Sequence, residues 1–168
     1  NIANAYVNSA MAANKNQNFD AAISSLNEAA GIAQRIPELN ASGVLNREYS
    51  IAFNGIYAQY LSAGEAALAQ SQLAAAETEA VRATQFQSQH PDMLAPEPAQ
   101  DLMIRVKQAQ YADHVRVGRE ALDLQRFGEA VTRLEAAMAL EGQYGIPVDS
   151  MLPDQVQNAA RPLILDAA

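Results

Sequence analysis

Apolar residues recur three and four positions apart in several stretches of the chain, and this spacing predicts helices with one buried face. The clearest stretch runs from 118 to 140 and contains two helical segments with a tight corner between them. The apolar face of the second segment comprises Phe127, Ala130, Val131, Leu134, Ala137 and Met138. Small residues at the crossing allow close approach of the two backbones, and Phe127 is expected to close the corner.

The same pattern occurs three times along the chain at a spacing of 54 residues. The aligned positions are Gly118, Phe127, Ala130, Leu134 and Ala137; Gly64, Leu73, Ala76, Ala80 and Ala83; and Ala10, Phe19, Ala22, Leu26 and Ala29. The flanking positions Val7, Leu61 and Val115 follow the same spacing. Two equal intervals without a gap indicate an internal repeat.

This order of small, apolar, aromatic and small residues resembles a tetratricopeptide repeat. The resemblance implies an all-α fold, namely a right-handed α-solenoid of antiparallel helical hairpins, with about seven helices in this chain. It also implies binding of a protein or peptide on a concave helical face. The usual repeat of the family is about 34 residues long, so the longer period predicts longer hairpins with extra turns mainly in the first helix.

The sequence predicts a single helical-repeat domain over 1–168. Its repeats cover about 1–45, 46–98 and 99–152, and a terminal half-repeat helix covers 153–168. The expected helices are 2–16, 19–35, 47–70, 73–89, 99–125, 127–141 and 154–168. Asn18 is placed to cap the second helix, and Pro162 is expected to kink or restart the last one. Repeat packing accounts for a glycine at Gly64, but not for Gly55, where a helix loses up to ~1 kcal/mol relative to Ala.

Charge and composition exclude several partners. The net charge is −8 and no run of basic residues occurs, which argues against a nucleic-acid partner. The chain has no Cys, so no disulfide or thiolate metal site is expected. It also has no apolar run of about 18 residues, so no membrane span is expected.

The compartment is left open by the sequence, with a secreted, periplasmic or extracellular location favoured. The chain begins at Asn1 without Met, as expected of a processed or trimmed chain. The sequon Asn40-Ala41-Ser42 makes Asn40 a candidate glycosylation site. The alternative is that this sequon is a chance occurrence.

Neither catalytic residues nor a cofactor or metal site can be identified from the motifs. The two histidines, His90 and His114, lie on different elements, and His114 takes a repeat position that favours packing. Glu77, Glu79, Asp123 and Glu129 are interpreted as solvated or locally paired. Tyr57 and Tyr111, also 54 apart, are expected to pack in the core or to face a groove.

Both chain termini correspond to the middle of the long first helix of the repeat, and three interpretations follow. The chain is a segment of a longer array, or its last helix caps its own third hairpin, or the termini of different copies join head-to-tail. The last interpretation predicts an interface that comprises Tyr6, Val7, Met11, Leu163, Ile164 and Leu165.

The favoured function is a non-catalytic structural or protein-interaction module that self-associates head-to-tail into a fibre or array. The alternative is a monomeric adaptor that binds a peptide or protein partner in its helical groove. An enzyme is a third class, which requires a catalytic constellation that only folding brings together.

Overall fold

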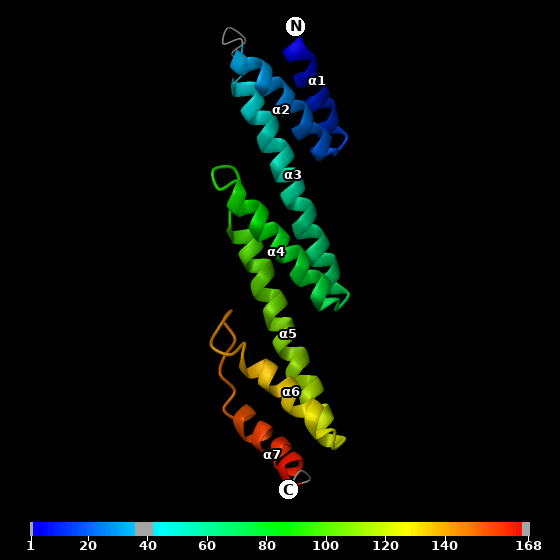
Figure 1. Cartoon of the computed structure of the whole chain (residues 1–168), viewed down its shortest axis with the longest axis vertical. Helices are drawn as coiled ribbons and strands as arrows, with labels where there is room; N and C mark the ends of the chain where they lie inside the picture. The colour runs from blue at the N-terminus through cyan, green and yellow to red at the C-terminus, as the bar shows by residue number, and fades with distance from the viewer. Residues whose placement is uncertain (1, 36–41, 166–168) are drawn as a thin grey trace. The chain divides into compact units, whose positions relative to one another are not determined.

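The computed structural model describes residues 2–35 and 42–165, and this part of the chain consists of seven α-helices without a β-strand (Figure 1). The all-α prediction is therefore confirmed. The helices are α1 (Ile2–Lys15), α2 (Phe19–Arg35), α3 (Ser42–Ala69), α4 (Leu73–Gln89), α5 (Glu97–Asp123), α6 (Phe127–Met138) and α7 (Leu152–Leu165).

Helix boundaries agree with the sequence prediction for α2 and α4 and differ elsewhere. α3 begins at Ser42 rather than at 47. Leu45, in the first turn of this helix, is buried in the core, and its packing accounts for the earlier start. α6 ends at Met138 rather than at 141, and α7 continues through Pro162 instead of restarting there. Asn18 caps α2 as predicted: its side-chain oxygen accepts a hydrogen bond of 3.4 Å from the Ala21 N–H.

The chain divides into two compact units, which are described separately. Unit 1 comprises Asn1–Gly64 and Glu79–Ala99, and unit 2 comprises Glu65–Thr78 and Gln100–Ala168. The single repeat domain and its boundaries stay a prediction.

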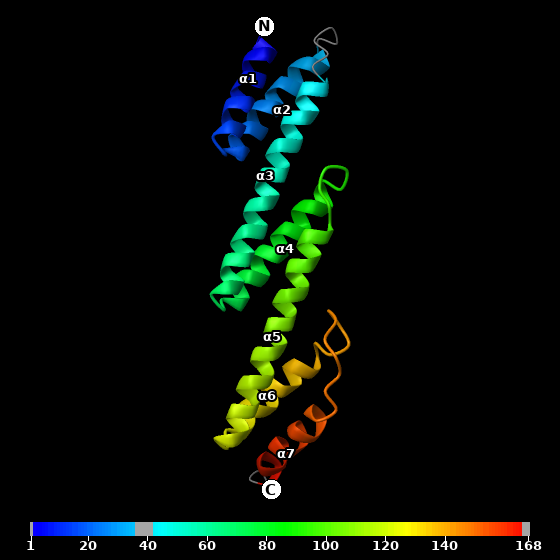
Figure 2. The same ribbon diagram turned by 180° about the vertical axis from the view of Figure 1, so that it is seen from behind.

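In unit 1, α1 packs along α2, and the start of α3 completes their shared core (Figures 1 and 2). The buried residues of this core are Val7, Ala10, Ala22, Leu26, Ala29, Leu45 and Ala52. A second cluster of unit 1 joins α3 to the end of α4 and to the start of α5, around the buried ring of Tyr57. The Tyr57 hydroxyl donates to the Ala95 carbonyl at 2.9 Å and accepts from the Ala99 N–H at 3.1 Å. Tyr57 therefore holds the loop before α5 in place.

In unit 2, the second half of α5 packs with α6 and α7, and α6 and α7 lie side by side in both views (Figures 1 and 2). The buried residues of this core are Ala121, Ala130, Leu134, Ala137, Leu152 and Ala159. Beyond α6, Arg119 donates to Asp149 at 2.9 Å, and the Asp149 N–H donates to Glu141 at 2.7 Å. These contacts connect the loop before α7 to α5.

The cores of the two units use equivalent positions. Leu26 and Leu134, 108 residues apart, are both fully buried, and Val7 and Val115 pack into the corresponding clusters. The start of α3 in unit 1 corresponds to α7 in unit 2, with an offset of 107 residues. The corresponding pairs are Leu45 and Leu152, Tyr49 and Val156, and Ala52 and Ala159. Each core is thus formed by two shorter helices and part of one long helix: α1, α2 and the start of α3 in unit 1, and α6, α7 and the second half of α5 in unit 2.

Three helix corners have the same backbone conformation. Gln17, Ser71 and Gln125 lie 54 residues apart and have φ values of 58°, 58° and 54°, in the left-handed region. At each corner the next residue donates back to the end of the preceding helix: Asn18 to Ala13 at 2.9 Å, Gln72 to Ala67 at 2.9 Å, and Arg126 to Ala121 at 2.8 Å. This pattern is a Schellman motif, which satisfies the last carbonyls of the helix. The 54-residue spacing predicted from the sequence is confirmed at these corners.

Candidate functional site

A line of five aromatic rings extends along α3 and the end of α4 in unit 1, and we call it the aromatic ladder. Its members, in order of contact, are Tyr49, Phe53, His90, Phe86 and Tyr60. α3 supplies positions 49, 53 and 60, and residues at this helical spacing share one face of a helix. All five side chains are half-buried, so each packs on one side and meets solvent on the other.

The ring geometry alternates between stacked and edge-on pairs. The Tyr49 and Phe53 rings stack with centroids 5.6 Å apart, and Phe53 stacks on His90 at 3.9 Å. Phe86 meets His90 edge-on at 4.9 Å and Tyr60 edge-on at 5.8 Å. Offset-stacked and edge-to-face pairs contribute about 0.5–1.5 kcal/mol each beyond the burial of their surface, which keeps the ladder ordered while it stays partly exposed.

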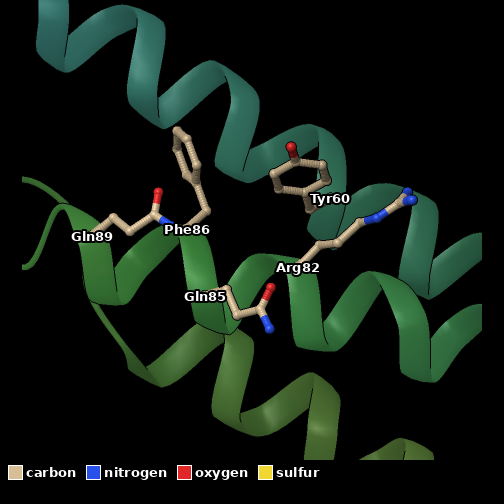
Figure 3. Close-up of a pocket in the computed structure, with 5 residues that line it drawn as sticks. All are labelled: Tyr60, Arg82, Gln85, Phe86 and Gln89. Atoms are coloured by element: carbon tan, nitrogen blue, oxygen red, sulfur yellow. The ribbon is translucent and has the colours of Figure 1, made fainter.

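One end of the ladder opens into a hollow of about 170 Å³ between α3 and α4. Tyr60 and Phe86 form its aromatic sides, and Arg82, Gln85 and Gln89 line it from α4 (Figure 3). The Arg82 guanidinium forms an ion pair of 2.7 Å with Glu79 through one nitrogen and is otherwise open to solvent. In the described part of the chain, the side-chain amides of Gln85 and Gln89 have no hydrogen-bond partner. The hollow therefore offers two ring surfaces beside unused hydrogen-bond donors.

The ladder departs from the internal repeat. One period away from Phe86 the chain has Ile32 and Leu140, and one period after Phe53 it has Lys107. The corner cores need no aromatic residue at these positions. The two other ladder positions have rings in other copies as well. Tyr6 and His114 lie one period from Tyr60, and Tyr144 lies one period from His90. The concentration of all five rings is specific to this copy.

This site was not predicted from the sequence, although Tyr60 occupies a repeat position that it shares with Tyr6 and His114. The available signal was the set of aromatic residues on one face of α3, together with the lack of a ring one period from Tyr49, Phe53 and Phe86. Tyr57, predicted to pack or to face a groove, is buried, and burial raises the pKa of its hydroxyl. Tyr111 is half-buried, and its hydroxyl pKa is raised first by burial and then by the charge of Glu141.

The residues predicted to form a head-to-tail interface are distributed as follows. Tyr6, Met11, Leu163 and Ile164 are exposed. Val7 is buried between α1 and α2, so its predicted exposure is wrong: it occupies the apolar face that α1 presents to α2. Tyr6 and Met11 lie about 140° apart around α1, since a helix turns by about 100° per residue. They therefore do not form a single patch.

Two of the candidate residues, Leu165 and Asn40, lie partly or wholly outside the part of the chain that the structure describes. Leu165 ends α7, and its side chain is outside the described part. The candidate glycosylation site Asn40 lies outside the described residues altogether.

Glu79 and Glu129 are locally paired and Asp123 is exposed, as predicted. Glu77 differs from the prediction, because it pairs with Lys107 on another helix. Glu79 pairs with Arg82, and Glu129 pairs with Arg126 at 3.0 Å. Glu77 accepts hydrogen bonds from Lys107 and Gln110, which lower the pKa of its carboxyl. In unit 2 these contacts hold α4 against α5.

His114 is half-buried in unit 2. Its ring Nδ1 lies 3.5 Å from Arg133, and burial, followed by the charge of Arg133, lowers the imidazole pKa. Within residues 2–35 and 42–165, no group of three or more His, Asp and Glu side chains is arranged to hold a metal ion. Among the described helices, none has the length and apolar content required to cross a membrane.

No protein-family model, no curated protein and no solved structure matches this chain. The resemblance to tetratricopeptide repeats therefore stays a prediction from the sequence.

Proposed function

We propose that the chain is a non-catalytic protein-interaction module that binds a peptide or protein segment at the aromatic ladder. In this proposal the helices form the expected right-handed solenoid of antiparallel, tetratricopeptide-like hairpins, and α3 and α4 present the ladder. The observation that carries it is the half-exposed line of rings beside the free amides of Gln85 and Gln89.

Protein interfaces favour this kind of surface. Aromatic and arginine side chains are enriched at interface centres and account for much of the binding energy. Rings that are already packed on one side lose little conformational freedom when a partner covers the other side. The ladder combines both properties, and the ordered pairs Phe53–His90 and Tyr60–Phe86 supply the preorganised part.

A selection from a random peptide display library on the immobilised protein tests this function. Peptides that bind the ladder should lose at least about tenfold in affinity on the combined substitution Tyr60→His and Phe86→Leu. Both replacements are the residues that the third copy has at these positions, His114 and Leu140, so the helices should tolerate them. Met103→Leu, at the position equivalent to Tyr49, serves as the control. If no peptide is enriched, or if the selected peptides bind the double variant as well as the parent, the proposal is wrong.

Head-to-tail self-association into a fibre or array is a second candidate, and the exposure of one repeat position supports it. Ile56 is only 8% exposed. The 54-residue spacing relates it to Ile2, which is 71% exposed. The 107-residue correspondence between α3 and α7 relates it to Leu163, which is 44% exposed. Leu163 also continues the apolar face of α7 that begins at Leu152. A second copy that covers Ile2 and Leu163 would bury them as Ile56 is buried.

Sedimentation velocity over a range of protein concentrations tests the second candidate. The sedimentation coefficient should rise with concentration, and the paired substitution Ile2→Gln and Leu163→Gln should abolish the rise. Gln is the residue at the equivalent position 110. Leu124→Gln removes an equally exposed apolar side chain elsewhere in unit 2 and should leave association unchanged. A monomer at all concentrations, or association that survives the paired substitution, would rule this candidate out.

A further inference from the structure

We propose that the hollow at the end of the aromatic ladder takes an extended, proline-containing peptide segment with an acidic residue beside Arg82. This inference rests on the proposed interaction function and adds the chemical class of the partner.

The ring surfaces favour a proline-rich segment. Such a segment adopts the polyproline II conformation, which is extended and already ordered before it binds, so little conformational entropy is lost on binding. Its pyrrolidine rings pack well on aromatic faces. Tyr60 and Phe86 meet edge-on, so their ring planes differ, and a three-sided peptide helix can contact both with successive prolines.

The amides of Gln85 and Gln89 can donate to the backbone of such a peptide. Gln85 and Gln89 are one helical turn apart on α4, and four residues of an α-helix rise by about 6 Å. Two residues of a polyproline II helix also rise by about 6 Å. The carbonyls of this conformation have no internal hydrogen-bond partner, and with three residues per turn the carbonyls of residues i and i+2 point about 120° apart. One carbonyl can accept directly from one of the two amides, and the flexible side chain of the other Gln can turn to reach the second.

The positive charge of Arg82 in the hollow favours an acidic residue in the partner peptide. Arg82 is the one charged side chain among the five that line it, although the whole chain has a net charge of −8. A guanidinium has five N–H donors, and Glu79 occupies only one of its nitrogens. The remaining donors are available to a carboxylate of the partner, which would bind bidentately.

The test is isothermal titration of the whole chain with a synthetic peptide of about ten prolines that ends in Glu. We expect measurable binding that weakens at least about tenfold when Gly and Ser replace the prolines. Replacement of the terminal Glu by Gln should weaken binding about twofold to fivefold at low salt. Arg82→Gln should remove this difference between the two proline peptides, while Arg35→Gln, a change of another exposed arginine in unit 1, should preserve it.

The variants Tyr60→His with Phe86→Leu, and Gln85→Ala with Gln89→Ala, should each reduce binding of the proline peptide at least about threefold. Circular dichroism melting of every variant controls for folding. If the proline peptide binds no better than the Gly and Ser peptide, or binds both variants as well as the parent, the inference is overturned. If display selection still returns peptides that depend on Tyr60 and Phe86, only the partner class is wrong; if it returns none, the interaction function is wrong as well.

Discussion

At the scale of single residues, the most unusual feature is a buried polar pair in the core of unit 1. Asn14 and Glu48 are 8% and 3% exposed. The Asn14 amide donates to the Glu48 carboxylate at 3.0 Å and to its backbone carbonyl at 3.1 Å, while Arg47 pairs with the other carboxylate oxygen at 2.9 Å. The side-chain oxygen of Asn14 has no partner within the described chain. The pair is therefore only partly satisfied.

Substitutions at this pair should show strong coupling. One period later the chain has Leu68 and Leu102 at the same positions, so an apolar pair fits the repeat. Asn14→Leu alone leaves a buried carboxylate without one donor and should lower the free energy of unfolding by about 1–3 kcal/mol. The double change Asn14→Leu and Glu48→Leu should restore or exceed the parent stability, by up to about 4 kcal/mol. Urea unfolding in a double-mutant cycle measures this coupling, and additive losses would contradict it.

Gly55, which the sequence pattern left unexplained, is explained by the ring of Phe19. A Cβ built on Gly55 would lie 2.3 Å from the end of this ring. Gly55→Ala should therefore destabilise the protein by about 1–3 kcal/mol through overpacking, although Ala favours a helix by up to ~1 kcal/mol. Gly31 lies in α2 with no atom within 4 Å of an added Cβ, so Gly31→Ala should stabilise the protein. Thermal melting of both variants gives the comparison, and a stabilised Gly55→Ala would show that the contact is loose.

At the scale of elements, the three corners store similar backbone strain. Gln17, Ser71 and Gln125 adopt a left-handed conformation that glycine adopts without steric cost. Replacement of any one of them by Gly should raise the free energy of unfolding by about 0.5–1 kcal/mol, since the relief is partly offset by the greater freedom of Gly in the unfolded chain. Ser71→Ala keeps the strain and is the matched control. Unequal effects at the three corners, measured by urea unfolding, would contradict their equivalence.

The corners could be predicted from the sequence because their determinants are local. Small and apolar residues at helical spacing specify the close crossing, and the same burial is found at Leu26 and Leu134. The start of α3 could not be predicted, because it depends on burial of Leu45 against α2, a contact between distant parts of the sequence. The pair of Asn14 with Glu48 could not be predicted for the same reason. The sequence shows only that polar residues occupy positions where the next copy has Leu.

The candidate site was less predictable than the fold. Titratable and metal-binding motifs are recognised by their spacing in the sequence, whereas the rings of the ladder come from α3 and from the end of α4 and are brought together by packing. Phe53 and His90 are 37 positions apart, yet their ring centroids lie 3.9 Å apart. Their proximity depends on the angle between two helices, which no local pattern specifies.

At the scale of the whole molecule, the net charge of −8 bears on self-association. Two copies repel each other, and the range of this repulsion falls from about 20 Å or more at low salt to a few Å near 1 M. Contacts through Ile2 and Leu163 are apolar and do not weaken when charges are screened. Added salt should therefore strengthen association through these residues.

Sedimentation velocity at about 20 mM and about 0.5 M NaCl measures the effect. We expect the association constant to rise several-fold at the higher salt, because screening removes repulsion while the apolar contact persists. The variant with Ile2→Gln and Leu163→Gln should stay monomeric in both buffers, which separates this contact from general salting-out. Weaker association at high salt would instead indicate an interface held by ion pairs, and the apolar positions would not be its basis.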